Sequence, residues 1–119
     1  MKGSRLVRIN DEIQREVAGI VRGELKDPRI GTMVSVLRVE TTQDLKFCKI
    51  FVSAMGNEDE RREAFEGIRS AGGFIRRLLA ERLNLRATPQ LTFVLDDSIE
   101  HGIRISKLLD ELNKDGGNE

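Results

Sequence analysis

The sequence predicts a single α+β domain, in which helices pack on one side of a small three-stranded sheet. The chain has 119 residues, 39% of them hydrophobic, which suits one compact core. Apolar residues recur at helical spacing in several segments, whereas two neighbouring runs are rich in Val, Ile and Phe. The resulting order of helix, strand, strand, helix, kink, helix, strand and helix is typical of an α+β domain.

Residues 6–25 predict the first, amphipathic helix. Its apolar positions lie three or four residues apart and describe one face: Leu6, Ile9, Ile13, Val17, Ile20 and Val21. Pro28 ends the helix, because proline disfavours the helical conformation in the residue before it.

A hairpin is expected next, with strands at residues 33–41 and 47–54 and the polar sequence TTQDLK between them. Successive side chains of a strand point to opposite faces. We therefore expect Cys48, Ile50 and Val52 to face the core, and their neighbours in the strand to face away.

The second half predicts a kinked helix, a strand and a last helix. Asn57 and Glu60 resemble a capping box that opens a helix over residues 58–70, and the helical period resumes over residues 74–84. A third strand follows at residues 91–95. The last helix is expected to turn its apolar residues inward: Ile105, Leu108, Leu109 and Leu112.

Residues 1–112 are predicted to form the domain, and the polar, glycine-rich residues 113–119 a disordered tail. Cys48 is the only cysteine, so it forms no internal disulfide and is expected to pack as a small hydrophobe. No apolar run approaches the roughly 18 residues that span a bilayer, and no leader pattern opens the chain. These features predict a cytoplasmic protein.

Charge is balanced over the chain but not along it. Twenty basic residues accompany twenty acidic ones, so the net charge points to no partner. Between residues 69 and 86, five arginines accompany one acid, Glu81, whereas residues 96–119 lean acidic. A basic segment of this kind suits phosphates, and a solvated charged surface is the equally weighted alternative.

No pattern in the sequence predicts catalysis, a metal or a cofactor. His101 is the only histidine, and its neighbours Asp96, Asp97 and Glu100 lie where a strand passes into a helix, a place at which acids commonly cap the helix. The spacings of Cys, His and acidic residues fit neither zinc nor calcium, and no phosphate-binding loop ends in Gly-Lys-Ser or Gly-Lys-Thr. We therefore expect no enzyme, with a hydrolase built on His101 as the weaker alternative.

Two adjacent glycines, Gly72 and Gly73, interrupt the helical pattern after Ala71. A glycine in a helix interior costs about 1 kcal/mol relative to alanine, so the pair predicts a break. A helix that restarts at about Phe74 presents unpaired N–H groups and a partial positive charge, which suits an anion. The structural alternative is that the glycines only let the helices pack closely, with the arginines paired to acids such as Glu81.

On this expectation Arg76 and Arg77 fall in the first helical turn, where a positive side chain opposes the helix dipole unless an anion binds. The chain has no Trp or Tyr, and its five Phe occupy mostly core-like positions, so stacking of bases on aromatic rings is not expected. Contact with structured RNA through phosphates and shape, sensitive to salt, is the predicted mode of binding.

Four segments in order resemble those of the bacterial ribosome-binding factor A family: LKDPRIG, TTQDLKFCKIFVS, SAGGFIRRLLAERLNLRATPQLTF and DDSIEHGIRISKLL. The resemblance runs from Arg5 to Leu112. It implies a K-homology-like fold of the second topological type, in which an Ala-x-Gly kink replaces the usual Gly-x-x-Gly loop. In this chain the kink is Ala71-Gly72-Gly73.

The resemblance also implies a function. It is that of a non-enzymatic assembly factor that binds the free small ribosomal subunit and its rRNA, assists late rRNA maturation including that of the 5′ end, and supports growth in the cold. Such a factor stabilises one rRNA conformation by binding it better than the others. The basic C-terminal extension of some members has no counterpart in this chain, which ends in an acidic tail.

The expected rRNA-binding residues are the kink, the basic residues around it and the start of the first helix: Arg69, Ala71, Gly72, Gly73, Arg76, Arg77, Arg82, Arg86, Lys2, Arg5 and Arg8. Some of these arginines are expected instead in surface ion pairs worth under about 1 kcal/mol. We expect a monomer that binds no cofactor, metal or membrane. The alternative function is an adaptor that recruits a maturation GTPase or a ribosomal protein and contacts little RNA.

Overall fold

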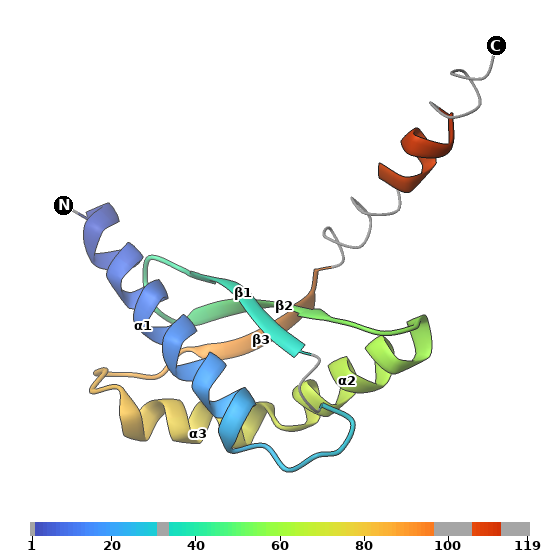
Figure 1. Ribbon diagram of the computed structural model, residues 1–119. Helices are drawn as coiled ribbons and strands as arrows, with labels where there is room; N and C mark the ends of the chain where they lie inside the picture. Colours follow the sequence, from blue (N-terminus) through green and yellow to red (C-terminus); the bar gives the residue numbers. More distant parts are fainter. Residues whose placement is uncertain (1, 31–33, 97–105, 113–119) are drawn as a thin grey trace.

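The computed structural model describes residues 2–30, 34–96 and 106–112, with side chains from Arg5 on. Its elements are α1 (Lys2–Gly23), β1 (Val34–Thr41), β2 (Phe47–Ala54), α2 (Glu58–Ser70), α3 (Gly72–Arg82) and β3 (Gln90–Leu95), and residues 106–112 form a further short helix. β2 is the central strand, antiparallel to β1 and parallel to β3 (Figure 1). The predicted α+β class and order of elements are confirmed.

The sheet has one covered face and one open face. Cys48, Ile50 and Val52 of β2 are 1%, 0% and 1% exposed, as the predicted alternation requires. They form one core with apolar residues of all three long helices: Ile13, Val17, Ile20, Ile68, Ile75 and Leu79. The helices therefore lie on one side of the sheet, as predicted.

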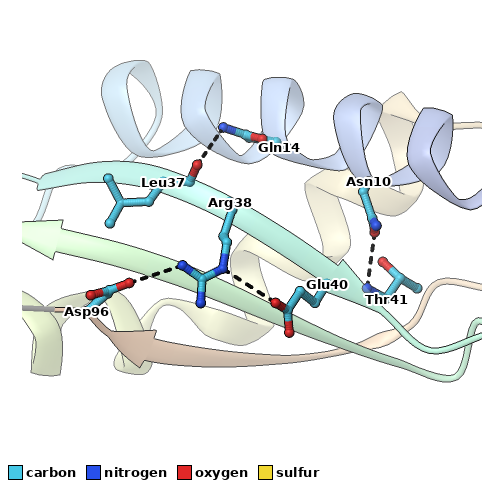
Figure 2. Close-up of polar contacts among 7 residues, drawn as sticks. All are labelled: Asn10, Gln14, Leu37, Arg38, Glu40, Thr41 and Asp96. Atoms are coloured by element: carbon cyan, nitrogen blue, oxygen red, sulfur yellow. Dashed lines mark hydrogen bonds and ion pairs between the residues drawn. The ribbon is translucent and has the colours of Figure 1, made fainter. Parts of the chain in front are cut away.

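Side chains of α1 also close the outer edge of β1. Gln14 Nε2 donates a hydrogen bond to the carbonyl oxygen of Leu37 at 3.1 Å, and the Thr41 N–H donates to Asn10 Oδ1 at 3.1 Å (Figure 2). Leu37 lies where the pairing of β1 with β2 shifts register. An edge strand otherwise presents unpaired backbone groups to other chains, so α1 both covers the sheet and protects its edge.

The open face of the sheet carries a polar network in place of a helix. The Arg38 guanidinium lies 3.9 Å from the centre of the Phe51 ring. It also reaches Asp96 at 3.2 Å and Glu40 at 3.4 Å (Figure 2). The aromatic face and the two carboxylates stabilise the cation, and the cation covers the ring.

The helix ends follow local sequence signals in part. The Glu60 N–H donates to Asn57 Oδ1 at 2.8 Å and the Asn57 N–H donates to Glu60 Oε1 at 3.1 Å, which confirms the capping box of α2. α1 begins at Lys2, earlier than predicted, although Gly3 lies in its first turn. It ends at Gly23, before the predicted Leu25, so the helix stops several residues before Pro28.

The helix at residues 106–112 does not turn its leucines inward. Leu108, Leu109 and Leu112 are 54%, 54% and 65% exposed, so that prediction is wrong. The physical reason is that α1, α2 and α3 already occupy the covered face of the sheet. Ile105 and the tail at 113–119 lie outside the described residues.

The segment after α1 packs against α2 at a glycine. A Cβ atom at Gly67 would lie 2.9 Å from Ile30 Cγ1 and 3.2 Å from Asp27 Oδ2. Arg29 Nη2 donates to Asp27 Oδ2 at 2.6 Å, and this hydrogen-bonded pair lowers the pKa of the Asp27 carboxyl. Because Ile30 is buried and the turn is held by its own ion pair, neither neighbour has room to move away from an added methyl group.

We predict that Gly67→Ala destabilises the fold by about 1–3 kcal/mol, since overpacking outweighs the better helix propensity of alanine. The matched control is Gly19→Ala in α1, where an added Cβ meets no atom within 4 Å. The control is expected to gain about 0.5–1 kcal/mol. Urea unfolding followed by circular dichroism measures both, and an equal gain in the two variants would contradict the packing described here.

Candidate nucleic-acid interface

The interruption between α2 and α3 is one residue long. α2 ends at Ser70, Ala71 takes φ −86° and ψ 2°, and α3 begins at Gly72. The prediction that the helix restarts at about Phe74 is therefore wrong, because both glycines belong to the first turn of α3. Neither glycine has a positive φ, so the backbone conformation at these positions is one that other residues also adopt.

Because α3 begins earlier than predicted, two arginines lie one turn further into the helix than the sequence suggested. Arg76 and Arg77 fall in the second turn of α3 and not in the first turn, as the sequence predicted. The helix dipole acts mainly within the first turn, so the expected conflict between these cations and the dipole is largely absent.

Packing within the protein does not explain the two glycines either. A Cβ atom at Gly73 would meet no atom within 4 Å, and one at Gly72 would meet only Phe93 Cε2, at an ordinary 3.7 Å. Gly73 is exposed and Ala71 is half-buried, so the corner lies at the surface. The missing Cβ atoms leave room for a backbone from outside the protein to approach closely.

α3 begins without a side-chain cap. The first N–H groups of a helix have no acceptor within the helix, and they carry the positive end of its dipole. Phe74, in this first turn, is 37% exposed. The start of α3 thus retains the features of an anion site that the sequence predicted.

Two of the predicted arginines flank this start at the surface. The Arg77 guanidinium lies 5.3 Å from the Phe74 ring centre and makes no ion pair with any residue in the described ranges. Arg69 lies 5.9 Å from the ring centre of Phe65 and 3.4 Å from Glu66 Oε1. That ion pair is solvent-exposed and weak, so it competes little with a phosphate. We call Arg69, Ala71, Gly72, Gly73 and Arg77 the kink corner.

Two other predicted arginines stabilise the fold. Arg76 donates from Nε to the Pro89 carbonyl at 3.0 Å and from Nη2 to the Thr88 carbonyl at 2.8 Å, which holds the loop before β3. Arg82 pairs with Glu24, which directly follows α1, at 2.9 Å, and with Glu16 of α1 at 3.8 Å. Pairing with acids was the structural alternative, but these partners lie in and just after α1 and not on the same helix as Arg82. Contact of these arginines with rRNA stays a prediction.

Arg5 and Arg86 both lie at a second site, away from the kink corner. They line a cavity of about 690 Å³ at the end of the sheet where β2 begins, together with Arg76, Lys46 and Phe47. We call this cavity the sheet-end pocket. Lys46 and Phe47 were not predicted as site residues, because only the fold brings the hairpin beside Arg5 and the loop before β3.

Of the remaining predicted residues, Arg8 is an exposed residue of α1 outside the lining of the pocket. The side chain of Lys2 lies outside the described residues. His101 and Asp97, the proposed helix cap, also lie outside the described residues. Asp96 binds Arg38 on the open face.

The expectation that the phenylalanines are mostly core residues is wrong. Only Phe93 of the five is buried, whereas Phe47 and Phe74 are 53% and 37% exposed. Phe47 lies on the open face of β2 and Phe74 at the start of α3, where no other element covers them. Aromatic surface is therefore available beside both basic clusters.

Elsewhere in the described part of the chain, we looked for reactive, metal-binding and membrane-spanning features. Burial raises the pKa of the Cys48 thiol, so it stays neutral in the core. The described part of the chain contains no group of three or more His, Cys, Asp or Glu placed to hold a metal ion. None of its helices is both long and apolar enough to cross a membrane.

Comparison with known proteins identifies relatives of the whole domain. The model of the family described as ribosome-binding factor A matches residues 5–109. The ribosome-binding factor A of Lachnospira eligens is 50% identical over 107 residues, covering 90% of this chain and 82% of that protein. That of Agathobacter rectalis is 48% identical over 108 residues, covering 91% and 89%.

Solved structures share the fold. A Thermotoga maritima protein proposed to be a ribosome binding factor A, solved by NMR, is 32% identical with a TM-score of 0.68 over 76% of this chain and 85% of that one. The crystal structure of ribosome-binding factor A from Thermus thermophilus is 23% identical with a TM-score of 0.66, covering 76% and 94%. A homology model of a Thermus thermophilus ribosome binding factor A, fitted into a cryo-EM map of its 30S complex, has a TM-score of 0.61 at 24% identity, covering 74% and 91%.

These likenesses confirm the K-homology-like fold that the sequence motifs implied. A family model that spans residues 5–109, and relatives of about half identity over nine-tenths of the chain, agree with each other. The chain belongs to the ribosome-binding factor A family.

Proposed function

We propose that this chain binds the small ribosomal subunit and its rRNA as a non-enzymatic assembly factor, and that the kink corner contacts rRNA phosphates. Membership of the family supports the partner, as does the related Thermus thermophilus protein, whose model was fitted into the map of a 30S complex. The observation that carries the site is the pair of glycines at the exposed start of α3. Neither backbone conformation nor packing within the described chain requires them.

The geometry suggests how the corner acts. A phosphate that approaches Gly73 meets the first N–H groups of α3, which have no side-chain cap, and the positive end of its dipole, and the guanidinium groups of Arg69 and Arg77 flank it. Such contacts fix the position of the rRNA backbone without reading its sequence. An rRNA conformation that fits them is stabilised relative to one that does not, so the protein needs no chemical step.

Further parts of the proposal follow the family. We assign to this chain a role in late rRNA maturation, including that of the 5′ end, and in growth in the cold. It is proposed to act as a monomer in the cytoplasm.

Replacing Gly73 with alanine separates binding from folding. We predict that Gly73→Ala leaves the fold unchanged or more stable by about 0.5–1 kcal/mol, because the added methyl group meets no atom of the protein. The same methyl group blocks a close-approaching phosphate, so affinity for isolated small subunits is expected to fall about tenfold, or about 1.4 kcal/mol. Sedimentation with purified subunits measures the affinity. Gly19→Ala is the matched control, and equal binding by both variants would remove the glycines from the site.

Reversing the charge of Arg77 tests whether the kink corner binds rRNA phosphates electrostatically. Arg77→Glu is expected to fold normally, to lower affinity for the small subunit more than tenfold, and to flatten the slope of log K against log salt by about 0.9 for each phosphate that the variant no longer neutralises. Arg22→Glu is the control, because Arg22 is an exposed arginine of α1 with no ion pair among the residues described. If the two variants bind alike, the corner is not where rRNA docks.

One observation favours a second function, that of an adaptor for a maturation GTPase or a ribosomal protein. Leu108, Leu109 and Leu112 are more than half exposed on a single short helix, which suits contact with an apolar protein surface. Binding through this helix is expected to be lost in Leu108→Lys/Leu112→Lys and to change little between low and moderate salt. Binding through the kink corner is expected to survive those substitutions and to weaken steeply with salt.

A further inference from the structure

We propose that the sheet-end pocket takes one unpaired RNA nucleotide, with its base stacked on Phe47 and its flanking phosphates held by Arg5, Lys46 and Arg86. This inference deepens the proposed function and rests on it, since the nucleotide belongs to the rRNA that the kink corner contacts.

The pocket is large enough for one nucleotide. Its volume of about 690 Å³ lies within the range of small-molecule sites, roughly 300–1,000 Å³. Its walls come from the N-terminal part of α1, the turn between β1 and β2, and the segment from Asn84 to Gln90. Ile9, Leu45 and Leu85 supply an apolar lining that suits the edge of a base.

The charge of the lining is strongly positive. Four basic side chains line the pocket, Arg5, Lys46, Arg76 and Arg86, and one acid does, Asp44. Of these cations, Arg5, Lys46 and Arg86 form no ion pair with any described residue. Three basic side chains that form no ion pair, around one concave site with a single acid, indicate an anionic ligand with more than one phosphate.

The acid in the lining is already engaged. Asp44 Oδ1 accepts from the Thr42 hydroxyl at 2.6 Å and from the Lys46 N–H at 3.0 Å. These hydrogen bonds, with that from Thr42 first, hold the pKa of the Asp44 carboxyl below its usual range. Asp44 thus shapes the turn that presents Lys46 and Phe47, and it attracts the Lys46 side chain electrostatically. Arg5 and Arg86 form no ion pair with it.

The aromatic ring of Phe47 favours a nucleobase, and not a bare phosphate, as the ligand of the pocket. Its side chain is 53% exposed at the first position of β2, beside Lys46 and the pocket. Every nucleobase has a flat face that stacks on an aromatic ring, and cations beside the ring bind the adjoining backbone. In an A-form duplex the bases are stacked on each other, so only an unpaired base from a loop, bulge or end can enter.

The pocket is held in shape before any ligand binds. Arg76 fixes the carbonyl groups of Thr88 and Pro89, and the Gln90 N–H donates to the Lys46 carbonyl at 2.9 Å. These bonds tie the loop before β3 to the hairpin. A preformed site spends less binding free energy on ordering its walls.

The absence of tryptophan from the chain allows a direct test. Phe47→Trp places one fluorescent ring at the proposed stacking position, and Met55→Trp places one at the other end of β2, where Met55 is 68% exposed. Single-stranded pentauridylate is expected to quench the Phe47→Trp variant saturably and to leave the Met55→Trp variant unchanged. A duplex RNA of the same length is expected to quench neither. Equal quenching of both variants, or none of Phe47→Trp, overturns the inference.

Two further variants measure the separate contacts. Phe47→Leu keeps an apolar side chain but loses the flat ring, so its affinity for pentauridylate is expected to fall between about fivefold and a hundredfold. Arg86→Gln is expected to flatten the slope of log K against log salt by about 0.7, the value for one phosphate of a single strand. Both positions are exposed, and unchanged urea midpoints verify that the variants are folded. Wild-type affinity in both variants would overturn the inference.

Small-subunit binding distinguishes this inference from the proposed function. If wild-type protein binds subunits, Gly73→Ala loses affinity, and pentauridylate leaves Phe47→Trp unquenched, the proposed function stands and the pocket assignment fails. If pentauridylate quenches Phe47→Trp but the protein does not bind subunits, the pocket assignment stands and the proposed function fails. Quenching of Phe47→Trp by a ribosomal protein, without quenching by pentauridylate, makes the pocket a protein contact and overturns the inference.

Discussion

Burial of one face of β2 is the interaction on which the rest of the structure depends. A straight helix from residue 58 to residue 82 would be about 37 Å long, whereas an eight-residue strand is about 26 Å long. Such a helix would extend beyond the sheet. With the break at Ala71, Ile68 before it and Ile75 after it both reach 0% exposure in the same core. The kink therefore keeps both α2 and α3 packed on the sheet.

The kink and its glycines have different causes. Ala71 alone interrupts the helix, with an ordinary negative φ, and α3 starts directly after it. Gly72 and Gly73 add nothing to that geometry, and glycine is a poorer helix former than alanine. Gly73 is exposed, and an added Cβ there would meet no atom of the described chain, so a contact outside the protein best explains it. This separation of fold from function is what the sequence alone did not reveal, because a glycine pair suggests a break by itself.

Local patterns predicted most of the fold, and long-range contacts account for what they missed. β2 and α2 have the predicted bounds, because strand alternation and a capping box act within a few residues. The start of α3 and the leucines at 106–112 depend on which surfaces other elements already fill, and periodicity carries no such information. In the candidate sites, Arg69 and Arg77 are neighbours of the kink in sequence.

The sheet-end pocket, by contrast, joins Arg5, Phe47 and Arg86, which no spacing rule connects. α3 links it to the kink corner, because Arg76 lies just after the corner and its guanidinium holds the loop that forms one wall of the pocket. α3 is about 16 Å long and stiff, so the two sites keep a fixed separation. On the two proposals made above, an rRNA that presents a phosphate and an unpaired nucleotide at that separation would engage both, and the second contact would then form at high effective concentration. An rRNA with another shape engages only one. The difference in affinity between the two shapes is the free energy by which a protein without a chemical step favours one conformation.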